Sequence, residues 1–257
     1  GRLMALGDAL AEIGTWPAAL AVGSDQPWRH ICGDAARKTQ CPRKREAWAA
    51  LARSGRTNVA VRLNAHGIRM HMDGARLMNA VVASGISARE YSSYVDSVWI
   101  DLSKGLGAPV GAVLAGPRDF IEEARFWKHR LGGAMRQAGI IAAAGVYALR
   151  HHVDRLAEDH ANAKLIEAGL AEIPGIKLLS GPVETNIIIF SVADTGMTAV
   201  EFADRLLREH DVRVGPYADK TTVRIVTHLD VSRADCERAV AAIRDVVMSR
   251  QLSAVAQ

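Results

Sequence analysis

The sequence predicts an α/β protein in which two folded domains follow an atypical N-terminal segment. From Ile68 onward, short runs of β-forming residues alternate with helix-forming segments, and Gly, Ser or Asp residues separate them. After residue 152 long charged helices alternate with short strands, which is typical of a smaller α+β domain. We therefore expect three parts, namely residues 1–64, a larger domain at 65–152 and a small C-terminal domain at 153–257. A chain of 257 residues, 49% of them hydrophobic, is long enough to bury a core in each domain.

In the larger domain the alternation predicts three strands and three helices. The strands are expected at Ile68–Met72, Ser97–Leu102 and Gly111–Ala115, and the helices at Arg76–Ser84, Arg118–Leu131 and Met135–Arg150. The second helix is amphipathic. The third is so rich in alanine that we expect it to cross the interior of the domain. Strands and helices in this order indicate an α/β layer.

The small domain is predicted to open with a long helix that Pro174 and Gly175 end. Two further helices and three short strands follow it. The helices are expected at Val153–Glu172, Ala199–His210 and Arg233–Ser249, and the strands at Asn186–Val192, Val212–Val214 and Thr222–Thr227.

The first quarter of the chain differs from the rest in composition. Residues 1–66 hold ten Lys and Arg but five Asp and Glu, so they carry the whole basic excess of a chain whose formal net charge is +4. They show no sustained period of 2 or 3.6, apart from a short helix that we expect at Arg45–Ala52. Charge of this kind is usually solvated surface, and we expect that here in preference to a nucleic-acid-binding arm.

The sequence predicts neither a membrane protein nor a secreted one. The longest apolar run, Ile140–Leu149, has ten residues and is too short to span a bilayer. Asp8 and Glu12 interrupt the apolar N-terminal stretch, which argues against a cleaved signal peptide. An odd number of cysteines without a CxxC motif favours a reduced, cytoplasmic setting and no metal site. The three cysteines are Cys32, Cys41 and Cys236.

Two short motifs suggest chemistry at one edge of the predicted sheet. Asp73, in HMDGAR, and Lys104, in DLSKGLG, lie 31 residues apart, and each follows a predicted strand. Taken singly, Asp73 is explained as a helix cap and Lys104 as a solvated lysine. Taken together, neighbouring strands would bring both to one sheet edge, where ligands bind in α/β proteins. A lysine there can form a Schiff base with pyridoxal 5′-phosphate and a carboxylate can pair with its ring nitrogen, while Ser103 offers a hydroxyl to the phosphate.

Five segments in register resemble one enzyme family. HMDGARLMNA, DLSKGLGAPVGAVLAG, LGGAMRQAGIIAAAGVYAL, ETNIIIF and VRIVTHLDVS are together similar to the low-specificity L-threonine aldolases. These are β-eliminating lyases of the fold type I group of pyridoxal 5′-phosphate enzymes. The resemblance runs from about residue 65 to the C-terminus. It implies the type I fold, here with an incomplete large domain that has a mixed sheet, and a small α+β domain.

The resemblance also implies roles for individual residues. Lys104 resembles the Schiff-base lysine and Asp73 the partner of the pyridine nitrogen. Arg76 resembles the arginine that faces the cofactor and the substrate carboxylate, and Arg224 the small-domain arginine that binds this carboxylate, for which a planar guanidinium is suited. Arg136 resembles a residue near the cofactor phosphate of a neighbouring subunit, although Ala134 stands where the family usually has a third glycine.

The resemblance does not extend to residues 1–64, where the family's phosphate loop and ring-stacking histidine are not recognisable. A truncated gene, a frameshift or a divergent arm would each explain this. His71 and His228 could transfer protons near neutral pH, but we expect a structural role for each in preference. His71 shares the strand face of Asp73, and His228 is expected to order the turn after its strand.

The activity implied is cleavage of L-threonine or L-allo-threonine to glycine and acetaldehyde by a cytoplasmic homotetramer or dimer that binds neither nucleic acid nor membrane. The alternatives are another pyridoxal 5′-phosphate lyase acting on amino acids, or a non-catalytic remnant.

Overall fold

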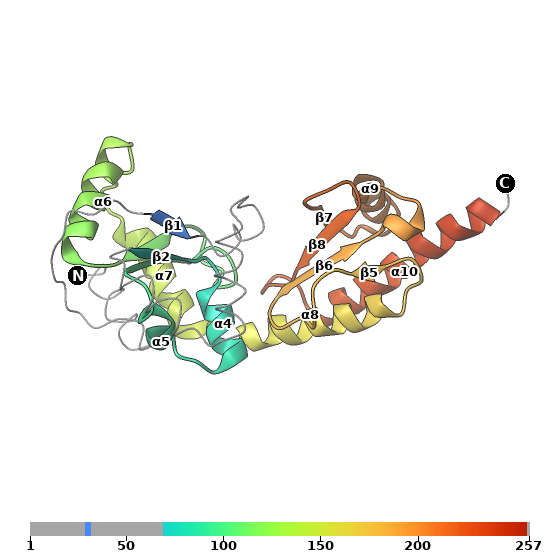
Figure 1. The fold of residues 1–257 in the computed structure, drawn as a ribbon, viewed down its shortest axis with the longest axis horizontal. Coiled ribbons are helices and arrows are strands. Elements are labelled where there is room, and N and C mark those ends of the chain that lie inside the picture. The colour runs from blue at the N-terminus through green and yellow to red at the C-terminus, as the bar shows by residue number, and fades with distance from the viewer. Residues whose placement is uncertain (1–28, 32–68, 256–257) are drawn as a thin grey trace. The chain divides into compact units, whose positions relative to one another are not determined.

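The computed structural model describes residues 29–31 and 69–255, and the chain divides into two compact units, Gly1–Asp154 and Arg155–Gln257 (Figure 1). Each unit has its own four-stranded sheet. The helix expected at Arg45–Ala52 lies outside the described residues, as does most of the atypical segment 1–64.

The sheet of the first unit is mixed, as the resemblance implied. Its strands follow the order β1-β2-β3-β4. The first three pair in parallel and β4 pairs antiparallel to β3. The sequence analysis did not predict β1, because three residues carry too little pattern to distinguish a strand from a loop. The strands are β1 (Arg29–Ile31), β2 (Met70–Gly74), β3 (Ser97–Asp101) and β4 (Ala112–Ala115).

Alternation along β2 and β3 gives this sheet one apolar and one polar face. Met70, Val98 and Ile100 are buried on the apolar face. In the parallel register His71 lies opposite Ser97 and Asp73 opposite Trp99, so these four residues share the polar face. The strand end is tightly packed, because a Cβ atom at Gly74 would overlap the carbonyl oxygen of Trp99.

Four described helices belong to the first unit: α4 (Leu77–Ser84), α5 (Ala88–Ser92), α6 (Arg118–Arg130) and α7 (Gly139–His151). The sequence analysis missed α5, a single short turn that the Ser87 hydroxyl caps by accepting from the Glu90 amide at 3.2 Å. The expectation that the alanine-rich helix crosses the interior is wrong for α7. One of its faces buries small residues, but the side chains of Ile140 and Tyr147 are 72% and 58% exposed.

The second unit packs three helices against an antiparallel sheet of order β5-β6-β8-β7. A strand predicted at Val212–Val214 is found instead at Gly215–Pro216. Val212 cannot start it, because its amide closes the end of α9 by donating to Leu206, after Asp211 turns the chain at φ 53°. The elements are α8 (Leu156–Ala171), β5 (Lys177–Leu178), β6 (Ile187–Ser191), the 3₁₀ helix η2 (Ala193–Thr195), α9 (Ala199–His210), β7 (Gly215–Pro216), β8 (Thr222–Val226) and α10 (Arg233–Val255).

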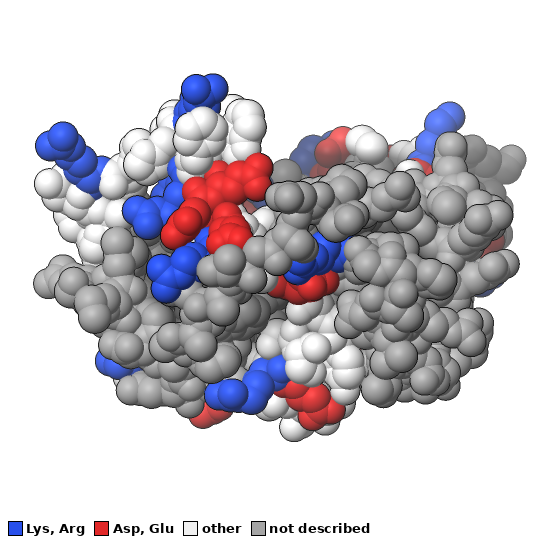
Figure 2. All heavy atoms as spheres, turned by 60° about the vertical axis from the view of Figure 1, so that its left-hand side comes forward, with Lys and Arg blue, Asp and Glu red and all other residues white. Residues whose placement is uncertain are grey.

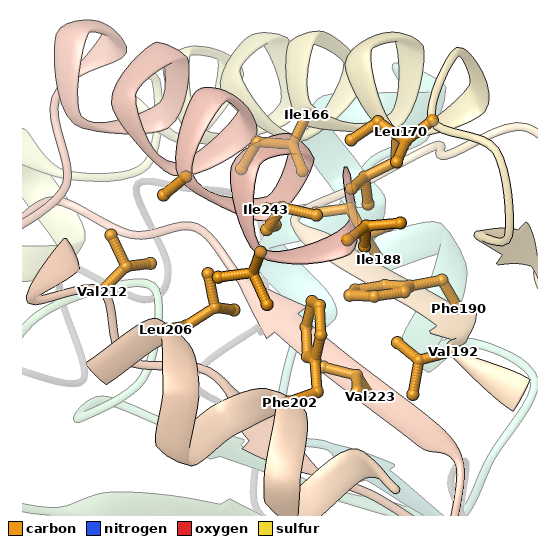
Figure 3. Packing of buried hydrophobic residues seen from close by; sticks show 14 of the residues in the cluster. Ile166, Leu170, Ile188, Phe190, Val192, Phe202, Leu206, Val212, Val223 and Ile243 are labelled. Atoms are coloured by element: carbon orange, nitrogen blue, oxygen red, sulfur yellow. The ribbon is translucent and has the colours of Figure 1, made fainter. Parts of the chain in front are cut away.

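The core of the second unit lies between the helices and one face of this sheet. Figure 3 shows side chains from α8, β6, α9 and α10 pointing toward one another. Phe190 and Phe202 are fully buried and meet edge to face, with ring centroids 6.0 Å apart. Since side chains alternate along β8, the burial of Val223 on the core side directs Arg224 to the opposite face of the sheet.

Basic and acidic side chains of the described residues lie close to one another on the surface drawn in Figure 2. None of the described helices combines the length and the apolar character that crossing a membrane requires.

Candidate active site

Lys104 follows the end of β3 and points its ammonium group back at that strand. Its Nζ lies 2.9 Å from Oδ2 of Asp101 and 5.2 Å from the centroid of the Trp99 ring. The Lys104 side chain is 38% exposed, whereas that of Asp101 is 11% exposed. Lys104 is thus accessible to a ligand, while two residues of the strand contact its ammonium group: Asp101 through its charge and Trp99 through its aromatic ring.

Backbone hydrogen bonds close the segment after Lys104 into a compact loop. The Gly107 amide donates to the Lys104 carbonyl at 2.9 Å, and the Ala108 amide donates to the Leu102 carbonyl at 2.8 Å. Gly107 and Gly111 have φ values of 67° and 123°, which an L-residue with a Cβ atom rarely adopts. These two glycines are therefore needed for the loop that presents the lysine.

The loop is also tied to the end of α7. Nδ1 of His152 lies 2.6 Å from the carbonyl oxygen of Leu106. A carbonyl only accepts, so Nδ1 carries the proton in this bond.

Asp101 is the residue of this site that the sequence analysis did not assign. Its Oδ1 accepts from the Ser103 amide at 2.8 Å and from the Ser103 hydroxyl at 2.7 Å, and its Oδ2 pairs with Lys104. Burial raises the pKa of Asp101, but the hydrogen bonds from Lys104 and Ser103 outweigh burial and hold the pKa below its usual value. The i, i+3 spacing of a carboxylate and a lysine was the available signal.

Asp73 shares the polar face with this lysine pair. It lies opposite Trp99 in the sheet, and the Trp99 ring in turn contacts Lys104. Its Oδ1 accepts from the Ala75 amide at 3.1 Å, so Asp73 does order the turn into α4. Within the described part of the chain, no hydrogen bond to its Oδ2 is found, and this oxygen can accept one from a ligand.

Arg76 immediately precedes α4 at the same strand end. With Asp101 it lines a cavity of about 10 Å³, whose wall Gly74, Ile100 and Leu106 also form. A space of this size holds about one water molecule. This cavity is therefore too small for a ligand larger than water.

The two histidines are held by neighbouring groups. Nδ1 of His71 lies 2.8 Å from the Ser97 hydroxyl on the polar face. Nδ1 of His228 accepts from the Asp230 amide at 3.2 Å, which is the turn-ordering geometry considered for it above.

The two remaining arginines lie apart in the chain from the lysine loop. Arg224 belongs to the second unit, and its guanidinium carbon lies 4.9 Å from the centroid of the Tyr217 ring. Arg136 lies in the exposed loop between α6 and α7, one residue before Gln137, which has φ 53°. Neither guanidinium forms an ion pair with a carboxylate of the described residues.

A model of the beta-eliminating lyase family matches residues 57–195, more than half of the chain. The chain belongs to the beta-eliminating lyase family. The matched range includes both Asp73 and Lys104.

Curated relatives of this family member agree with the assignment. It is 43% identical over 166 residues to the low specificity L-threonine aldolase of Escherichia coli (strain K12), a match that covers 65% of this chain and 47% of that protein. It is 36% identical over 186 residues to low-specificity L-threonine aldolase 1 of Arabidopsis thaliana, covering 72% and 52%. The chain spans about half the length of the curated relatives it matches.

A solved structure confirms the predicted fold. The threonine aldolase of Leishmania major superposes with a TM-score of 0.59 at 21% sequence identity, over 74% of this chain and 55% of that one. The α/β architecture with a mixed sheet in the first unit is accordingly that of the type I fold.

The described residues fit two of the three ends of pyridoxal 5′-phosphate. Lys104 would supply an accessible amine for the aldehyde, and Asp73 would supply a carboxylate oxygen for the ring nitrogen. The phosphate is the third end. The Ser103 hydroxyl already donates a hydrogen bond to Asp101, so it could donate one to the phosphate only if the bond to Asp101 broke. No cluster of three or more potential metal ligands occurs among the described residues.

Proposed function

We propose that the chain is part of a pyridoxal 5′-phosphate-dependent lyase of the threonine aldolase type. Such an enzyme cleaves the Cα–Cβ bond of L-threonine or L-allo-threonine to give glycine and acetaldehyde. The observation that carries the proposal is the placement of Lys104 and Asp73 on one face and one edge of the sheet, in a chain of the beta-eliminating lyase family. The substrate class follows the relatives, which are named as threonine aldolases.

Each residue of the proposed site has a separate task. When bound, pyridoxal 5′-phosphate supplies a protonated ring that withdraws electrons from the substrate's Cα. Lys104 provides the amine that bonds to the cofactor, and Asp73 keeps the proton on the ring nitrogen by accepting a hydrogen bond from it. The family resemblance assigns the substrate carboxylate to Arg76 and, separately, to Arg224, since a guanidinium can donate two parallel hydrogen bonds to a carboxylate.

We also propose that the protein assembles as a homo-oligomer, a tetramer or dimer, with Arg136 directed at the phosphate of a neighbouring copy. The support is a group of large hydrophobic side chains on α6, on α7 and in the loop that connects them, each at least half exposed in this chain. They are Phe126, Trp127, Leu131, Met135, Ile140 and Tyr147. The proposed cytoplasmic location is consistent with the free thiol of Cys236.

Two alternatives keep the same site. Another pyridoxal 5′-phosphate lyase would use the same lysine and aspartate, because these residues act on the cofactor and not on the substrate's β-carbon. The second alternative is a non-catalytic remnant, because the family's phosphate loop is not recognisable in the sequence of residues 1–64.

Purifying the chain with pyridoxal 5′-phosphate and measuring its absorbance and its acetaldehyde production from threonine distinguishes these functions. We expect an imine band and acetaldehyde release, both absent from Lys104→Ala and both retained by the control Lys128→Ala. An imine band without acetaldehyde would indicate another lyase. Absence of both from the wild type would indicate the remnant.

A further inference from the structure

We infer that Asp101 is a positioning residue for Lys104, whose ammonium it holds whenever Nζ is not bonded to the cofactor. The observation is the 2.9 Å ion pair between Oδ2 of Asp101 and Nζ of Lys104. The role in catalysis rests on the function proposed above, but the ion pair itself does not.

The geometry makes Asp101 a fixed acceptor. It is the last residue of β3, so the strand sets its backbone, and the Ser103 amide and hydroxyl both bind its Oδ1. Oδ2 therefore points in a defined direction, toward Nζ. A carboxylate that is 11% exposed has lost most of its water, and a charged partner compensates for that loss.

The Trp99 ring completes this holding site. Nζ lies 5.2 Å from the ring centroid, within the range of a cation–π contact. Nζ must leave both contacts before it can attack an aldehyde. The holding site therefore lowers the reactivity of Lys104 in the chain without cofactor and gives the displaced lysine a defined place to return to.

Amine acetylation of the cofactor-free chain measures this directly. The initial rate at Lys104, divided by the rate at exposed Lys128 in the same sample, is read by peptide mass spectrometry after a brief, low dose of acetic anhydride. Removing the charge in Asp101→Asn should raise this ratio roughly fivefold, the upper range for a partly exposed ion pair. A ratio equal to that of the wild type would overturn the inference.

Two further variants separate the ion pair from other causes. Asp73→Asn makes the same charge change on the same sheet face, and we expect it to raise the Lys104 ratio less than twofold. Asp101→Glu keeps the charge and should stay closer to the wild type than Asp101→Asn does. If Asp73→Asn raises the ratio as much as Asp101→Asn, or if Asp101→Glu does, general charge or loop damage explains the effect and the inference fails.

This test does not depend on the proposed function. Adding pyridoxal 5′-phosphate to the wild type tests that function separately, through the imine band. Without an imine band the proposed function fails, while the acetylation ratios still decide the role of Asp101.

Discussion

Single residues at the ends of β2 and β3 determine where the side chains at this edge of the sheet lie. Gly74 brings β2 against Trp99 so closely that a Cβ atom would overlap the Trp99 carbonyl. Asp73 immediately precedes this glycine and lies opposite Trp99. The position of the proposed ring-nitrogen partner thus depends on the absence of a side chain at the next residue.

Gly74→Ala should therefore destabilise the first unit. An overlap with backbone atoms can be relieved only by a shift of the strand, and we expect a loss of about 1–3 kcal/mol in the free energy of unfolding. Urea denaturation measures it. Gly181→Ala is the control, because nothing lies within 4 Å of a Cβ atom there. Equal effects of the two substitutions would contradict this account of the strand end.

The elements show what sequence patterns can and cannot predict. Strands β2 and β3 were found within two residues of their bounds because β-formers and turn residues delimit them clearly. Strand β7 was misplaced by three residues, since the capping bonds that end α9 involve the backbone and leave little trace in the side-chain pattern.

The spacing of Asp73 and Lys104 was enough to predict that both lie at one edge of the sheet, whereas the sequence analysis assigned no role to Asp101. Its role follows from the side-chain geometry at the strand end, where it meets both Lys104 and Ser103. A quoted motif indicates which residue types are present but not which of them contact one another.

At the element scale, the bond from His152 to Leu106 should stiffen the lysine loop. We expect His152→Leu to speed amide hydrogen exchange at Gly107 and Ala108, because the loop loses its tie to α7. In His152→Asn the side-chain amide can donate from nearly the position of Nδ1 and should restore much of the protection. Exchange rates unchanged in His152→Leu would mean that the loop's own backbone bonds suffice.

The start of α10 should show a pH-dependent cap. The Ser232 hydroxyl donates to Oδ2 of Asp235 at 2.6 Å and accepts from the Asp235 amide at 3.2 Å. The hydrogen bond from the Ser232 side chain is the main cause that lowers the pKa of Asp235 below its ordinary 3.8. A lowered carboxylate pKa stabilises the fold above pH 3.8, and this stability is lost as the pH falls through the folded-state pKa.

Ser232→Ala should thus lower the Tm at pH 7 by a few degrees, as expected for the loss of a helix cap. Circular dichroism melts at pH 7 and at pH 3 measure the change. The difference between wild type and variant should be smaller at pH 3, and a larger difference at pH 3 would contradict the assignment.

Considered as a whole, the chain combines the proposed site at a sheet edge with large apolar side chains exposed on α6, on α7 and in the loop that connects them. Leu131 is 83% exposed and Ile140 is 72% exposed, values that are unusual for side chains of this size in a monomer. A second copy of the chain is the partner we propose for this surface.

Leu131→Glu should therefore reduce the oligomer, because it places a charge in the proposed interface. Sedimentation velocity should show a shift toward smaller species. Val200→Glu is the control, since Val200 is also exposed but belongs to α9 of the second unit. A wild type that sediments as a monomer would remove the basis for this interface.

Lys104 is the residue that we propose bonds to pyridoxal 5′-phosphate. Borohydride reduction of the chain with the cofactor, followed by peptide mass spectrometry, identifies the bonded lysine. We predict a reduced adduct concentrated on Lys104, with the other lysines labelled only at the level seen in Lys104→Ala. An adduct spread evenly over the surface lysines, or absent from Lys104, would contradict the account.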